Sequence, residues 1–125
     1  MSINKEITTI NVLGTEYTIV IRKISDDQEM KNNQLVGYCS GLEHKIIISD
    51  LNEKEYFPNL TDEEKDRFFK ETLRHEIIHA HLNESGLKNC TSSVSGPWSK
   101  NEEMVDWIAI QFPKLLNVFM EANCL

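Results

Sequence analysis

The sequence predicts an α+β fold in a single domain over residues 1–125: a small, mostly antiparallel sheet followed by two long helices. Segments rich in β-branched residues fill the first 50 positions, whereas both long segments after residue 60 begin with residues that cap helices. A chain of 125 residues is long enough to bury one core without disulfides or metals as supports. We therefore expect strands first and helices second.

Four strands are expected, in two pairs. Residues 7–13 and 16–23 flank Gly14-Thr15 and predict a hairpin. Residues 35–40 and 44–49 predict a second pair, joined by a short turn. Ile46-Ile47-Ile48 in the last strand is continuously apolar, which indicates a strand that is covered on both faces.

Two segments have the pattern of a capping box. Ser25 to Gln28 predicts a short helix that ends near Asn32. Thr61 to Glu64 predicts the start of a long helix that runs to about Ser85, where Gly86 supplies a stop. Apolar residues lie around most of the circumference of this long helix, so we expect it to be buried.

A last helix is expected over residues 100–122, after a polar loop. Ser99 is the expected N-cap, and Ser99-x-x-Glu102 is itself a capping box. Pro113 falls inside the helical pattern and is expected to kink or split the helix near Phe112, because proline has no backbone N–H to donate.

Composition argues against several classes of protein. The net charge is −7, which disfavours direct binding to nucleic-acid phosphates. No stretch approaches the roughly 20 apolar residues of a membrane span, and the first residues do not resemble a secretory signal. Cys39, Cys90 and Cys124 are odd in number and widely spaced, so we expect reduced thiols in a cytoplasmic protein.

The strongest motif lies in the first long helix. His75-Glu76-x-x-His79 places two imidazoles about 40° apart on one face, one turn apart, where both can bind one metal ion. Glu76 lies on the flank, where its carboxylate can take a proton from a metal-activated water. This spacing is typical of metal-dependent peptide hydrolases.

Two histidines do not complete a catalytic zinc site, which usually has three protein ligands and one open position. His81 lies about 200° around the helix from the pair, and no histidine follows it. His44 can reach the pair only through the fold. We therefore expect the third ligand to be a carboxylate of the last helix.

Glu102 and Asp106 are four residues apart and share one helix face. One can bind the metal, while the other accepts the N–H of a ligand histidine and fixes its tautomer. Glu103 lies about 100° around the helix and is the reserve ligand. The competing role for Glu102 is capping, because one side chain cannot fully do both.

These residues resemble a known pattern. His75-Glu76-x-x-His79 followed by Glu102-x-x-x-Asp106 is similar to the gluzincin motif of thermolysin-type metallopeptidases. The short length, the strands before the helix and the stretch Glu102 to Ala109 resemble the ImmA/IrrE family, minimal zincins of bacteria, mobile elements and phages. The resemblance covers mainly residues 72–82 and 101–112, and Ile78 stands where that family often has glycine.

The resemblance implies a minimal zincin fold in which Zn²⁺ is held by three residues: His75, His79 and Glu102. It implies that Asp106 contacts a ligand histidine and that Glu76 is the general base. A strand before the active-site helix then borders the cleft, and residues 44–49 are the candidate. The expected substrate is an intracellular protein or peptide, such as the transcriptional repressor of a mobile element.

Two alternatives use the same motif. The first is a non-catalytic regulatory protein that keeps zinc for stability, which would need a fourth protein ligand such as Cys90 or His44. The second is a DNA-associated protease of the SprT type, which the acidic composition disfavours. Tyr38 and Tyr56 are both candidates for donating to the developing oxyanion, and we expect Trp98 and Trp107 to be core or loop anchors.

Overall fold

The computed structural model describes residues 8–86 and 101–125. Within these residues it has a four-stranded mixed sheet and two long helices, which confirms the predicted α+β class. No helix among the described residues is both long enough and apolar enough to span a membrane. Ser99, Cys90, Trp98 and the predicted loop around them lie outside the described residues.

The first hairpin joins β1 (Thr8–Val12) to β2 (Thr15–Arg22) in antiparallel register. Its turn residues, Leu13 and Gly14, have φ angles of 50° and 93°. Two positive φ angles match the right-handed twist of paired strands, and glycine reaches this region without strain. The Asn11 side chain also accepts a hydrogen bond from the Gly14 N–H at 2.9 Å.

A short 3₁₀ turn, η1 (Ile24–Asp26), precedes helix α1 (Gln28–Asn33). The predicted capping box at Ser25 is wrong, because Asp27 caps α1 and accepts a hydrogen bond from the Met30 N–H at 2.9 Å. Arg22 and Tyr38 both donate to the other oxygen of Asp27, at 2.7 and 2.8 Å. Asp27 therefore links α1 to two strands.

The second strand pair is β3 (Gly37–Ser40) and β4 (Lys45–Ser49), which run antiparallel. The strand order is β1-β2-β4-β3, and β2 and β4 run parallel. The last strand in the sequence is therefore an inner strand, and β3 is an edge strand. Ile46, Ile47 and Ile48 are at most 2% exposed, as expected of a strand covered on both faces.

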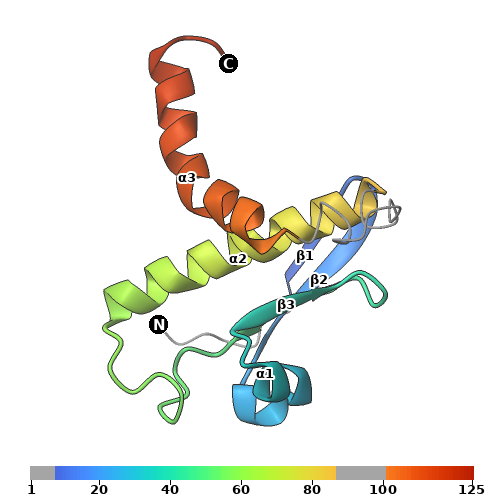
Figure 1. The fold of residues 1–125 in the computed structure, drawn as a ribbon, viewed down its shortest axis with the longest axis vertical. Helices are drawn as coiled ribbons and strands as arrows, with labels where there is room; N and C mark the ends of the chain where they lie inside the picture. The colour runs from blue at the N-terminus through green and yellow to red at the C-terminus, as the bar shows by residue number, and fades with distance from the viewer. Residues whose placement is uncertain (1–7, 87–100) are drawn as a thin grey trace.

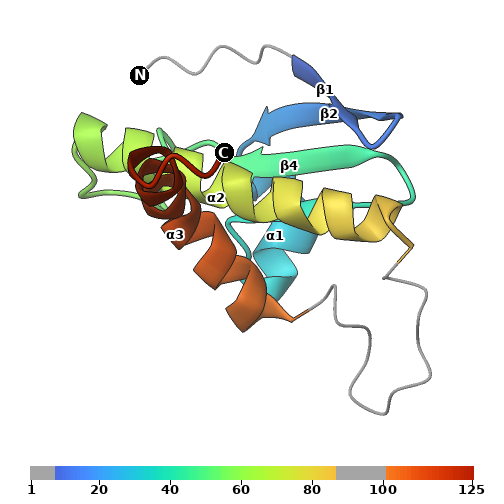
Figure 2. The same cartoon turned by 90° about the horizontal axis from the view of Figure 1, so that it is seen from above.

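Helix α2 (Asp62–Glu84) covers one face of the sheet (Figure 2). Its capping box is present: Thr61 Oγ1 accepts from the Glu64 N–H and Glu64 Oε1 from the Thr61 N–H, each at 3.1 Å. On the opposite face, α1 and the segment after β4 pack around Ile47. The expected full burial of α2 is wrong: only Glu76 and Ala80 are buried, because the sheet covers one side alone and α3 crosses part of another.

Helix α3 (Glu102–Glu121) crosses α2 with its first half and then projects away from the sheet (Figure 1). Its N-cap is Asn101, whose side chain accepts from the Met104 N–H at 2.9 Å, so Ser99 is not the cap. Pro113 does not split the helix, although the ribbon bends along its length. Val105 and Ala109 are buried, whereas later apolar side chains such as Val118 are largely exposed.

Candidate metal centre

His75 and His79 project from α2 on the same face, as their spacing requires. Their ring centroids are 4.8 Å apart at an interplanar angle of 67°. The side chains are only 15% and 12% exposed. Two largely buried imidazoles in edge contact need polar partners, because burial without such partners is costly.

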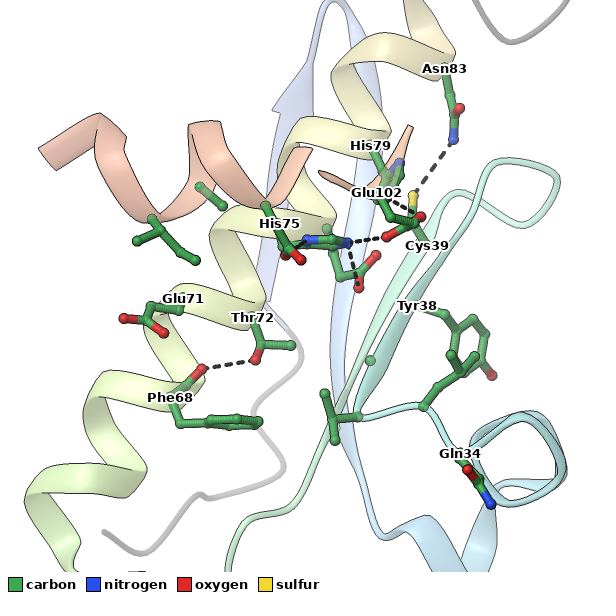
Figure 3. A pocket seen from close by; sticks show the side chains of 17 residues that line it. Gln34, Tyr38, Cys39, Phe68, Glu71, Thr72, His75, His79, Asn83 and Glu102 are labelled. Carbon is green, nitrogen blue, oxygen red and sulfur yellow. Dashed lines mark hydrogen bonds and ion pairs between the residues drawn. The ribbon is translucent and has the colours of Figure 1, made fainter. Parts of the chain in front are cut away.

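Glu102 supplies a partner to both imidazoles (Figure 3). Its Oε2 atom lies 2.9 Å from His75 Nε2, and its Oε1 atom lies 3.0 Å from His79 Nε2. Because Asn101 caps α3, the Glu102 side chain is not needed at the helix start and is free to face the histidines. The competition between capping and metal binding therefore does not arise at Glu102.

Asp106 holds the other nitrogen of one imidazole. Its Oδ1 atom lies 2.7 Å from His75 Nδ1. An ionised carboxylate can only accept a hydrogen bond, so the Asp106 contact favours a proton on Nδ1, while the His75 Nε2 atom is directed at Glu102. Carboxylates commonly fix the tautomer of metal-binding histidines in this way.

A hydrogen bond from Arg74 joins α2 to the backbone of α3. The Nε–H of Arg74 donates to the carbonyl oxygen of Ala109 at 2.6 Å. In an ordinary helix that carbonyl would accept from the N–H four residues later, but this residue is Pro113, which has none. Proline thus leaves an acceptor on the face that meets α2.

Glu76 lies beside the histidines and is only 6% exposed. Burial raises the pKa of its carboxyl group to about 7. His75 opposes this rise, while the carboxylates of Glu102 and Asp106 add to it. Glu76 is therefore a carboxyl group that can exchange a proton near neutral pH.

The donor set fits a zinc ion. Two ligand atoms bound to one tetrahedral zinc at about 2.0–2.1 Å lie roughly 3.3 Å apart. The Glu102 oxygens are 2.9 and 3.0 Å from the two Nε2 atoms, whereas Glu76 Oε2 is 4.0 Å from His75 Nε2. His75, Glu76 and His79 also form a compact group within 4.8 Å, but the shorter distances favour Glu102 as the third ligand and leave Glu76 beside the metal position.

Other sequence candidates lie elsewhere. The His44 ring contacts the Tyr17 ring at a tilt of 42°, and its Nε2 atom lies 3.8 Å from Glu84 Oε1. His81 Nδ1 contacts the Ile77 carbonyl oxygen at 2.9 Å. Glu103 is exposed on α3. Trp107 is 56% exposed, so the expectation of a core anchor is wrong.

Neither tyrosine candidate presents its hydroxyl to the histidines. Tyr38 lines the cleft but donates its hydroxyl to Asp27, and its side chain points away from the histidine pair (Figure 3). Tyr56 packs against the second core cluster, on the opposite face of the sheet from α2.

The histidines open into a cleft of about 710 Å³. One wall is α2, the second is β3 with the residues before it, and the third is the first half of α3. The strand expected at the cleft edge, residues 44–49, is the inner strand β4, so that prediction is wrong; the edge strand β3 takes this place.

Sequence reasoning did not single out several residues of this cleft, among them Gly37, Cys39, Glu71, Thr72 and Asn83. Glu71 and Asn83 could have been found from helix spacing, because they lie four residues before His75 and four after His79. Gly37 and Cys39 could not, since their place depends on strand order.

Comparison with protein-family models, with curated proteins and with solved structures finds no match to this chain.

Proposed function

We propose that this protein is a zinc-dependent endopeptidase that hydrolyses peptide bonds in an intracellular protein substrate. The observation that carries the proposal is the contact of one Glu102 carboxylate with the Nε2 atoms of both His75 and His79. Glu76 lies buried beside this cluster, and the cluster opens into a cleft. Metal ligands, an ionisable carboxyl group and space for a substrate thus occur together.

His75, His79 and Glu102 would hold the metal, and Asp106 would keep His75 in the tautomer that binds it. When bound, zinc would polarise the scissile carbonyl and make a water molecule more acidic. Three protein ligands would leave one position open, as in catalytic rather than structural zinc sites. Within the described part of the chain, His44 pairs with Glu84 and is no fourth ligand, which favours the catalytic alternative over a purely structural one.

Glu76 would act first as general base and then as general acid. Its carboxylate takes the proton of the attacking water and later gives it to the leaving amine. In the metal-free protein burial raises the pKa of the Glu76 carboxyl group to about 7, so this group can carry a proton from the first step to the second. The pKa of Glu76 is raised mainly by burial, so the burial of this side chain would contribute to its role as base and acid.

Edge strand β3 would bind the substrate backbone. It pairs with β4 on one side, and its other side pairs with no strand among residues 8–86 and 101–125. An extended peptide can add to such an edge by main-chain hydrogen bonds. The substrate would therefore be a flexible segment of a protein, and the ImmA/IrrE resemblance suggests a phage or mobile-element repressor in the cytoplasm.

Glu76→Gln tests the proposal, because it removes the base while leaving the metal ligands in place. Purified wild-type and Glu76→Gln proteins are each loaded with zinc and incubated with cell lysate, and new peptide termini are identified by mass spectrometry. We expect about one zinc per chain in both and new termini only with the wild type. Equal cleavage by both proteins, or no zinc in the wild type, would overturn the proposal.

A further inference from the structure

Glu71 lines the cleft but takes no part in the metal centre. It lies on α2 one turn before His75, so the two residues lie on the same face of the helix, and both line the cleft. Figure 3 shows it on the helix below the histidines, next to Phe68 and Thr72. The rise of an α-helix places it roughly 6 Å along α2 from the level of His75.

The side chain of Glu71 has no hydrogen bond or ion pair with another described residue. The nearest cationic side chains along α2 have other partners: Lys70 contacts Asp66 at 2.9 Å, and Arg74 donates to Ala109 at 2.6 Å. No lysine or arginine among residues 8–86 and 101–125 lines the cleft. The carboxylate of Glu71 is therefore available to a ligand, and no described residue of the cleft neutralises its charge.

Several other residues that line the cleft are apolar. Phe68 precedes Glu71 on α2, Leu35 lies on the β3 wall, and Ile110 lies on α3. Lysine and arginine side chains suit this combination of a carboxylate and apolar surface. Their long aliphatic stem can cover the apolar surface while the charged end reaches the carboxylate. An apolar side chain would instead desolvate the carboxylate without compensation, and an acidic one would be repelled.

We propose that Glu71 determines specificity by selecting a lysine or arginine side chain of the substrate. An extended peptide advances about 3.3 Å per residue, so the basic residue would lie about two positions from the scissile bond. This inference rests on the proposed peptidase function. The preference of Glu71 for a basic side chain can nevertheless be measured by peptide binding, without any cleavage. The ion pair would lie at a partly exposed site, so a modest preference is expected.

The binding experiment uses three acetylated pentapeptides that differ at the central residue: lysine, its uncharged isostere norleucine, or glutamate. Binding to zinc-loaded Glu76→Gln protein is measured by competition with a fluorescent lysine peptide. We expect lysine to bind about threefold to tenfold more tightly than norleucine, with glutamate weakest. The double variant Glu71→Gln/Glu76→Gln should show no preference for the lysine peptide over the norleucine peptide.

Glu63→Gln is the matched control, because it removes the same charge from an exposed position of α2 outside the cleft. It should leave the lysine preference unchanged. Equal binding of the lysine and norleucine peptides, or a preference that survives Glu71→Gln, would overturn the inference.

A cleavage experiment separates this inference from the proposed function. A peptide library is digested with the wild type and with Glu71→Gln, and the cleaved termini are sequenced by mass spectrometry. Loss of the basic preference with cleavage retained supports the role of Glu71, and an equal preference in both contradicts it. If the wild type cleaves no peptide, the peptidase proposal fails for this library, while the binding result still decides the selectivity of Glu71.

Discussion

The Nε atom of Arg74 lies 2.6 Å from the carbonyl oxygen of Ala109, the acceptor that Pro113 leaves without its helical donor. Glu102 and Asp106 lie on the half of α3 that this contact ties to α2. The guanidinium of Arg74 bonds to α3 and not to a candidate ligand, so it connects the two helices that carry the candidate metal ligands.

Arg74→Ala should therefore weaken zinc binding without removing a ligand. The variant leaves a buried carbonyl without a partner, which costs about 1–3 kcal/mol of stability, and it loosens α3 over α2. Zinc affinity, measured by competition with a chromophoric chelator, should fall severalfold while circular dichroism keeps its helical signal. Arg67→Ala, at an exposed position of the same helix, should not change the affinity. Unchanged affinity in Arg74→Ala would show that α3 is fixed by other contacts.

Glu102→Ala and Glu103→Ala distinguish the third ligand from its reserve. Glu102 contacts both imidazoles, whereas Glu103 is exposed. We expect Glu102→Ala to lose zinc on dialysis and Glu103→Ala to keep about one zinc per chain, as measured by plasma emission spectrometry. Full zinc in Glu102→Ala would contradict the assignment.

Asp106→Asn should lower zinc affinity but keep the site. The amide is a weaker acceptor for the His75 Nδ1–H, and it can also present its NH₂ group and favour the wrong tautomer. Loss of such an outer partner typically costs about 10- to 100-fold in metal affinity or activity. Isothermal titration with zinc measures the effect, and an affinity equal to that of the wild type would remove Asp106 from this role.

The metal-free protein should become less stable as pH rises from about 4.5 to about 7. The folded-state pKa of Glu76 is raised from 4.5 to about 7, so the unfolded chain releases this proton first. The contribution of Glu76 to the free energy of unfolding is fully present below pH 4.5. It is lost as pH rises through 7, by up to about 3 kcal/mol.

Urea unfolding in the presence of a chelator measures this dependence. Glu76→Gln cannot ionise, so its stability should fall less over the same interval, and it should exceed the wild type at pH 8. Parallel pH profiles for the two proteins would show that Glu76 ionises in the folded state as easily as in the unfolded state.

Gly37→Ala should narrow or displace the cleft. An added Cβ would lie 3.0 Å from Thr72 Cγ2 and 3.1 Å from the Ile47 carbonyl oxygen, and the backbone atom cannot move cheaply. We expect about 1–3 kcal/mol of destabilisation and a loss of peptide cleavage, with zinc content unchanged. The double variant Gly37→Ala/Thr72→Ser removes the shortest of these contacts, the one with Thr72 Cγ2, and should regain part of the activity. No recovery would place the strain at Ile47.

Local signals in the sequence predicted much of the fold and the relative placing of the candidate site residues. Some features depend only on residues close together in the chain and can be predicted from the sequence. They are the Thr61 capping box, the hairpin around Gly14 and the four-residue spacings on the helices. For the same reason His81 could be set apart from His75 once the helix geometry was applied.

Tertiary arrangement was less predictable. Periodicity indicates that residues 45–49 form a buried strand, but it does not reveal that β4 inserts between β2 and β3. Ser99 and Asn101 have similar capping preferences, so the register of the helix start could not be decided. The contact of Arg74 with Ala109 depends on how α3 crosses α2, which no local pattern encodes.

The inner position of β4 has a consequence for how the protein must fold. β3 is joined to the sheet only through β4, and β4 pairs in parallel with β2, from which it is separated by α1 and β3. Such pairings between distant segments form late, because the loop must close before contacts reward it. The β3 wall of the cleft therefore depends on the buried isoleucines of β4, and slow pairing of β4 with β2 would delay formation of the cleft.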